Sequence, residues 1–143
     1  MRLILVLWSI WTAGAAGAAE VVDFYAHWGD GKAELSSYDV VQPRYGELRQ
    51  GYGVMIFVTE DINRDTFIKV ESPTPKEQRL YVLKFNNVLK FTTGIYDYSV
   101  MTSVFSEVEG PEHSFVLRKI SLSTQEWCGH VFDEVQLRDG RLN

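Results

Sequence analysis

Cysteine is almost absent from this sequence of 143 residues, in which Cys128 is the single one. No disulfide can therefore form within the chain, and the burial of apolar side chains must stabilise the fold. A single thiol is buried as a small apolar side chain, paired with another molecule, or used chemically.

Basic residues are fewer than acidic ones, with 14 Lys and Arg against 19 Asp and Glu. An acidic chain without a basic cluster argues against nucleic acid and anionic lipid as partners. Motifs of known chemistry are missing as well, since the sequence contains no G-x-S-x-G, H-E-x-x-H or EF-hand pattern. The sequence therefore contains no motif that indicates a particular reaction, and we expect no cofactor.

Apolar runs long enough to span a bilayer, about 20 residues, are also missing. The run from Leu3 to Trp11 is short, follows the cation of Arg2, and precedes small residues that end in Ala18-Ala19. This pattern is typical of a secretory signal peptide. We therefore predict a signal peptide over residues 1–19 and one exported domain over residues 20–143, periplasmic or extracellular, with no transmembrane span after cleavage.

The body of the chain is rich in β-branched and aromatic residues, grouped in short runs between turn residues. No segment of a dozen residues has apolar positions at helical spacing. The predicted strands cover residues 32–41, 50–59, 65–71, 80–91, 96–107, 115–125 and 131–138. The short connections favour antiparallel neighbours, because parallel pairing needs long crossovers.

Two strands show how the sheet is covered. From Tyr96 to Phe105 apolar and mixed positions alternate, which predicts one face toward a core. From Val54 to Val58 every position is apolar, which predicts a strand covered on both faces. The fold class that follows is all-β, an antiparallel meander forming a curled sheet, a sandwich or a half-barrel.

The C-terminal residues suggest an incomplete sheet. A strand over 131–137 precedes the hairpin turn Arg138-Asp139-Gly140-Arg141, and the sequence stops two residues later with nothing to pair back. We expect this chain to be the N-terminal part of a longer protein. The alternative is a frayed natural C-terminus.

The densest cluster of reactive side chains is Glu126, Cys128 and His130. In one extended segment these three side chains would project from the same face, about 6.6 Å apart. Cys128 would then be a thiolate nucleophile with His130 as its base and Glu126 orienting the imidazole, or the three would form part of a metal shell. The competing hypothesis buries Cys128 as a small apolar residue, with Trp127 on the opposite face and Gly129 turning the chain.

Aromatic residues are numerous and either fill the core or line a concave pocket for an apolar ligand. The candidate ligand-binding residues are Trp127, His27, Trp28, Tyr45 and Tyr96. His27 would act as a second imidazole beside His130, or would bond a backbone group at a strand end. His113, in a predicted hairpin loop, is expected to be solvated.

Several segments resemble a family of uncharacterised exported bacterial proteins. The most specific ones are TGIYDYSVMTS at 93–103 and STQEWCGH at 123–130, with further similarity at 33–38, 42–47, 57–60 and 83–86. Members are often lipoproteins and continue well past the last residue here, which agrees with an incomplete chain. Some are labelled septum formation inhibitor Maf, a cytoplasmic α/β nucleotide pyrophosphatase, and the predicted signal peptide and β body of this chain do not support that activity.

The sequence therefore predicts a cell-envelope β protein without catalytic activity that binds a lipid, an apolar ligand or a protein partner. The alternative is an enzyme or metal-site protein that uses Cys128 and His130. Fast labelling of Cys128 by a thiol reagent would favour the alternative, whereas a copurifying apolar guest would favour the binding module.

Overall fold

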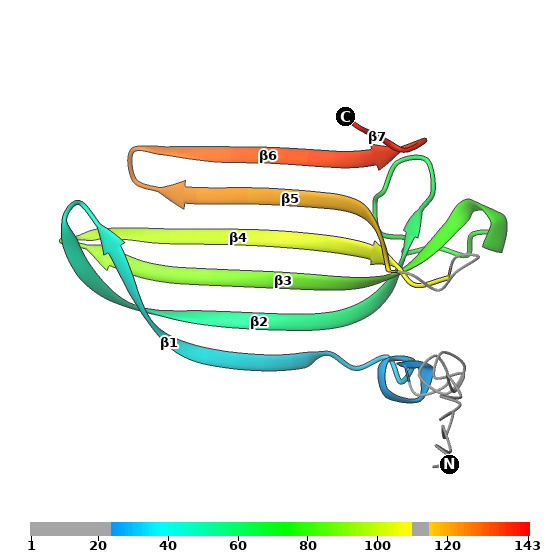
Figure 1. Ribbon diagram of the computed structural model, residues 1–143, viewed down its shortest axis with the longest axis horizontal. Coiled ribbons are helices and arrows are strands. Elements are labelled where there is room, and N and C mark those ends of the chain that lie inside the picture. The colour runs from blue at the N-terminus through cyan, green and yellow to red at the C-terminus, as the bar shows by residue number, and fades with distance from the viewer. Residues whose placement is uncertain (1–23, 110–114) are drawn as a thin grey trace, which may run out of the picture.

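A computed structural model describes residues 24–109 and 115–143 (Figure 1). The predicted signal peptide and His113 lie outside these residues. One antiparallel sheet dominates, and its seven strands lie side by side in sequence order, so the prediction of an all-β meander is confirmed. The strands are β1 (Glu34–Arg44), β2 (Glu47–Asn63), β3 (Arg79–Thr93), β4 (Tyr96–Glu107), β5 (Val116–Glu126), β6 (Gly129–Arg138) and β7 (Arg141–Leu142).

Tight two-residue turns join several of the strands. Tyr45 and Gly46 connect β1 to β2 with φ of 54° and 75°, and Asp139 and Gly140 connect β6 to β7 with φ of 51° and 73°. Positive φ at both central positions defines the turn whose twist matches that of the flanking strands. These turns fix the register of both hairpins.

The strand predicted over 65–71 is wrong, because these residues form part of a loop between β2 and β3. Only Lys69 makes a bridge, to Ile62. The side-chain oxygen of Asn63 accepts hydrogen bonds from the backbone N–H groups of Asp65 and Thr66, at 2.9 and 3.0 Å. Such an Asx turn ends the strand by offering its backbone an alternative partner.

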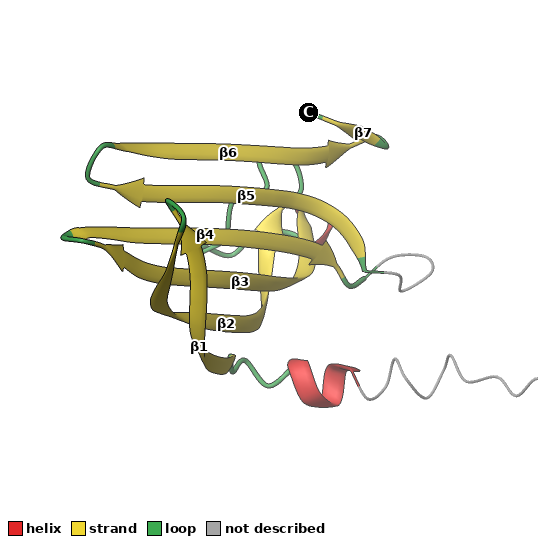
Figure 2. Ribbon diagram, turned by 60° about the vertical axis from the view of Figure 1, so that its left-hand side comes forward, coloured by secondary structure: helices red, strands yellow, loops and turns green. Residues whose placement is uncertain are grey.

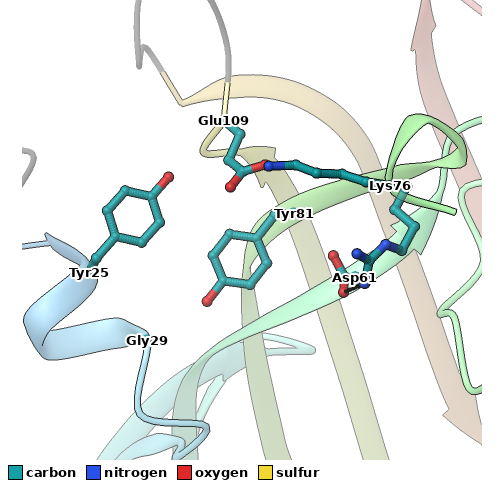
Figure 3. A pocket seen from close by; sticks show the side chains of 7 residues that line it. Tyr25, Gly29, Asp61, Lys76, Tyr81 and Glu109 are labelled. Atoms are coloured by element: carbon teal, nitrogen blue, oxygen red, sulfur yellow. Dashed lines mark hydrogen bonds and ion pairs between the residues drawn. The ribbon is translucent and has the colours of Figure 1, made fainter. Parts of the chain in front are cut away.

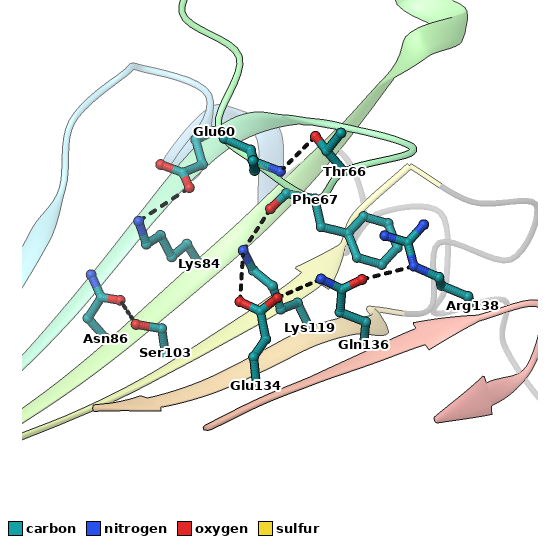
Figure 4. A network of polar contacts seen from close by, with 11 residues as sticks. Glu60, Thr66, Phe67, Lys84, Asn86, Ser103, Lys119, Glu134, Gln136 and Arg138 are labelled. Atoms are coloured by element: carbon teal, nitrogen blue, oxygen red, sulfur yellow. Dashed lines mark hydrogen bonds and ion pairs between the residues drawn. The ribbon is translucent and has the colours of Figure 1, made fainter. Parts of the chain in front are cut away.

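This loop, residues 64–75, covers part of one face of the sheet, named here the loop-covered face, and leads into the 3-10 turn η1 (Lys76–Gln78). A small core lies beneath, and its members are Ile62, Phe67, Leu80, Val82 and Phe105. Lys119 fastens the loop by donating a 2.7 Å hydrogen bond to the carbonyl of Phe67 (Figure 4). Beyond the core this face is mixed: Lys84 lies 3.3 Å from Glu60, whereas Val54, Ile56 and Val58 of β2 are apolar.

The opposite face is named here the open face. Register places Phe57, Phe85 and Val104 on it, in line across β2, β3 and β4. The even-numbered residues of 96–105 share this face, as the predicted alternation requires. The prediction that this face covers a core is wrong, because the small core lies on the opposite face, where Phe105 points. In the described part of the chain the sheet has no second layer, so Val54–Val58 is half-buried on both sides instead of enclosed in a sandwich.

The sheet is curled, and the β1–β2 hairpin bends across the open face (Figure 2). Its tip reaches β4, where the hydroxyl oxygens of Tyr45 and Tyr98 are 2.9 Å apart. Two glycines of β2 permit this bend, because a Cβ on Gly51 would collide with the carbonyl of Lys90. The sheet does not close on itself.

The prediction that nothing pairs back after the last turn is wrong. Arg141 and Leu142 pair with the end of β6, and the backbone of Asn143 exchanges two 2.9 Å hydrogen bonds with that of Gln136. The outer edge of β6 from Gly129 to Val135 pairs with no strand in the described residues. Within the same residues, no helix has the length and apolarity needed to cross a bilayer.

Candidate functional site

The open face carries a continuous set of apolar side chains from neighbouring strands. Its contributing residues, from β2 to β5, are Met55, Phe57, Leu83, Phe85, Leu89, Phe91, Tyr98, Val100, Val104, Ile120 and Leu122. Between Tyr81 and Thr93 on β3, and along all of β4, this face carries no charged side chain. Most members are half-buried. Because the sheet is curled and the β1–β2 hairpin bends across this face (Figure 2), this apolar surface is named here the trough.

Aromatic pairs line the trough. The rings of Phe57 and Phe85 stack with centroids 4.6 Å apart, and those of Phe91 and Tyr98 stack at 4.8 Å. In each pair the two rings come from neighbouring strands, at positions that the register places directly opposite each other. Flat aromatic surfaces of this kind offer large apolar contact area with few rotatable bonds.

The β1–β2 tip closes one end of the trough. The guanidinium of Arg44 lies 4.7 Å from the ring centroid of Tyr45 and 5.2 Å from that of Tyr98. The hydrogen bond from Tyr45, and then Arg44, lowers the pKa of Tyr98, whereas the same bond raises the pKa of Tyr45. Either hydroxyl can be the donor in this hydrogen bond.

The N-terminal helical turn, residues 24–28, covers part of the opposite end. Trp28 lies over Phe57, with ring centroids 5.9 Å apart. The hydroxyl of Thr59 holds the turn by donating a 2.8 Å hydrogen bond to the carbonyl of Trp28. Two of the predicted ligand-binding residues, Tyr45 and Trp28, therefore lie at opposite ends of the same trough.

A cleft of about 440 Å³ lies beside the same helical turn (Figure 3). Its lining residues are Tyr25, Gly29, Asp61, Lys76, Arg79, Tyr81 and Glu109. Tyr25 and Tyr81 stack with centroids 6.3 Å apart and planes inclined by 13°. Burial, then Glu109 and Tyr81, raises the pKa of Tyr25, so its phenol keeps its proton at neutral pH.

This cleft was not predicted from the sequence. Its charged members come from β2, from η1, from the start of β3 and from the segment after β4, and no local spacing links them. Only the register that pairs Asp61 with Tyr81 brings them together. The signal in the sequence is the aromatic pair Tyr25 and Trp28 in one short segment, of which only Trp28 is a predicted ligand-binding residue.

The predicted triad of Glu126, Cys128 and His130 does not share one face. Trp127 and Cys128 form the two-residue turn between β5 and β6, so Glu126 pairs with Gly129 while His130 pairs with Gln125. Directly paired residues point to the same side, which places Glu126 and His130 on opposite faces of the sheet. The prediction of a shared face is wrong because the extended segment that it assumed contains a hairpin.

Cys128 itself is exposed, so the hypothesis that buries it is also wrong. The Glu126 carboxylate accepts a 2.8 Å hydrogen bond from the Cys128 N–H, and its charge raises the pKa of the thiol. A raised pKa disfavours the thiolate that a nucleophile requires. No group of three metal-ligating side chains occurs in residues 24–109 and 115–143.

The remaining predicted residues lie at the edges of the sheet. Trp127 is 63% exposed and meets Tyr96 edge-on, with ring centroids 5.1 Å apart. His27 lies 3.7 Å from the carboxylate of Glu34, beside β1, whereas His130 belongs to β6 on the other side of the sheet. The two histidines therefore do not form a joint site.

Comparison with known proteins adds no relative: no family model, curated protein or solved structure matches this chain.

Proposed function

We propose that this protein is an exported, non-catalytic module that binds the apolar chain of a lipid-like ligand along the open face. The observation that carries the proposal is the uncharged trough across β3 and β4, which has no second layer of protein over it in the described residues. Contiguous apolar surface left open to water favours a bound apolar partner. Export rests on residues 1–19 and on the resemblance to exported bacterial proteins.

The energetics favour a chain-like ligand. Burial contributes about 0.8 kcal/mol for each methylene removed from water. A dodecyl chain laid in the trough gains up to about 10 kcal/mol before the cost of association, which is several kcal/mol. The trough is half-open, so binding should be weaker than full burial allows and should tighten as the chain lengthens.

An enzymatic role is less well supported. The three residues that would perform it are split between two faces and a turn, and the thiol has a raised pKa. The ring of Trp127 in this turn contacts Tyr96, which is itself exposed. The turn therefore lacks the paired nucleophile and base that covalent catalysis requires.

The experiment compares neighbouring residues of β4 that point to opposite faces. Val100 lies in the trough, and Met101 is the next residue, 40% exposed on the loop-covered face. Titration with the fluorescent apolar probe N-phenylnaphthylamine should show binding to the wild type. Val100→Asp should weaken that binding at least tenfold, whereas Met101→Asp should leave it within twofold.

Circular dichroism of each variant checks that the sheet remains folded. If Val100→Asp unfolds, Val100→Thr replaces it, because threonine has the same shape and adds one hydroxyl to the trough. Equal losses in the two variants, or no probe binding by the wild type, would contradict the proposal.

A further inference from the structure

The cleft at the end of the trough belongs to the same face of the sheet. Successive pairs along β2 and β3 are Phe57 with Phe85, Thr59 with Leu83, and Asp61 with Tyr81. Pairs on one face are about 6.6 Å apart, so apolar surface gives way to charged surface within about 13 Å. An amphiphile whose chain follows the trough would therefore bring its head group to this cleft.

Charges in the cleft are balanced. The Arg79 guanidinium lies 2.7 Å from the Asp61 carboxylate, and the Lys76 ammonium lies 3.7 Å from the Glu109 carboxylate. A purely anionic head group would meet two carboxylates, and a purely cationic one would meet two cations. A group that carries both charges can instead place each charge beside its opposite.

Free hydrogen-bonding capacity is present as well. The Arg79 guanidinium donates to Asp61 through one Nη atom, and its buried Nε has no acceptor in the described residues. Lys76 is only loosely paired, because its 3.7 Å contact with Glu109 exceeds hydrogen-bond distance. Guanidinium and ammonium groups are the usual donors to phosphate oxygens.

The other half of the cleft suits an ammonium group. Tyr25 and Tyr81 flank it with their rings, and the Glu109 carboxylate is directed toward the space beside them (Figure 3). Organic ammonium groups bind aromatic faces and carboxylates together, through cation–π attraction and charge. The two halves together are complementary to a phosphate and an ammonium on one molecule.

From this arrangement we infer that the cleft binds the zwitterionic head group of a phospholipid with a phosphate and a primary ammonium, while the acyl chain occupies the trough. Arg79 and Lys76 bind the phosphate, and Glu109 with the tyrosine pair binds the ammonium. The inference rests on the proposed function, because it names the ligand class of the same face.

The test uses amphiphiles of equal chain length, each below its micelle concentration, with binding measured by calorimetry. The three are lauroyl lysophosphatidylethanolamine, lauroyl lysophosphatidylglycerol, which lacks the ammonium, and the uncharged dodecyl maltoside. The wild type should bind the ethanolamine lipid at least tenfold more tightly than dodecyl maltoside. Its affinity for the glycerol lipid should lie between these two. Soluble glycerophosphoethanolamine tests the head group without any chain.

Four variants assign the two halves. Arg79→Gln should reduce the affinity for the ethanolamine lipid to that for dodecyl maltoside. Arg79→Lys should retain part of the preference for the ethanolamine lipid over dodecyl maltoside. Glu109→Gln should remove the preference for ethanolamine over glycerol. Lys69→Gln, an exposed change of charge on the loop, should alter no affinity. Circular dichroism again confirms folding.

The outcomes separate the two proposals. Equal affinity for all three amphiphiles would overturn the head-group inference and leave the apolar trough supported. Binding of glycerophosphoethanolamine without binding of any amphiphile would support the cleft and contradict the trough. No binding in either set, or tightest binding of dodecyl maltoside, would overturn the head-group inference.

Discussion

Truncation of Phe67 tests how much the loop contributes to stability. Its side chain is 3% exposed and belongs to a core cluster of five residues. Phe67→Ala removes that burial and leaves a cavity, which together cost about 3 to 5 kcal/mol. The guanidinium of Arg138, 4.5 Å from the ring centroid, adds about 0.5 to 1 kcal/mol. Because a domain is stabilised by only about 5 to 15 kcal/mol, this loss is a large fraction of the total.

Urea unfolding followed by far-ultraviolet circular dichroism measures the change, and the adjacent Ile68→Ala is its control. Ile68 is 66% exposed, so its truncation should change the free energy of unfolding by less than about 0.5 kcal/mol. Phe67 has a φ of 54°, which glycine adopts without strain, so Phe67→Gly should be at least as stable as Phe67→Ala. A loss below about 1 kcal/mol for Phe67→Ala, or equal losses at the two positions, would refute the loop as the cover of the core.

Three further predictions concern turns and strand contacts. Cys128 should react slowly with iodoacetamide at pH 7, because Glu126 raises the pKa of its thiol. The rate should rise as the pH approaches that pKa, and Glu126→Gln should move this rise to lower pH. An unchanged pH profile in the variant would count against this account. Gly51→Ala should lower the free energy of unfolding by about 1 to 3 kcal/mol in the same urea assay, because the added Cβ collides with β3. Gly129→Ala, with open space around its Cβ, should change this free energy by less than about 0.5 kcal/mol. Similar losses for the two variants would contradict the close approach of Gly51 to β3. Trp127→Ala should cost less than about 1 kcal/mol in thermal or urea unfolding, since the side chain is 63% exposed, and a larger loss would place it in a core.

The order and pairing of the strands were predictable because the local pattern determines them. Alternation from Tyr96 to Phe105 and the turn at Asp139-Gly140 are signals of short range, and both appear in the structure as the sequence predicts. The segment 65–71 misled the prediction because its composition resembles a strand. Its conformation depends on the side chain of Asn63 and on the burial of Phe67, which are tertiary effects.

The candidate site was less predictable. The turn at Trp127-Cys128 contains neither glycine nor asparagine, so the sequence predicts a break between residues 125 and 131 without revealing a two-residue turn. An extended conformation assumed for residues 126–130 assigns Glu126 and His130 to the same face, which is wrong. The cleft depends on register between distant segments, which pairs Asp61 with Tyr81. Long-range pairing of this kind leaves no spacing pattern for a single sequence to reveal.

Since each strand is bonded only to the strands before and after it in the chain, the sheet can assemble one hairpin at a time. Isolated hairpins form within about 1 to 10 μs, and no step of this assembly requires a distant segment to be threaded between existing strands. Acquisition or loss of a hairpin at either end of such a sheet leaves the remaining pairings intact, a property that makes the width of this architecture easy to change during evolution.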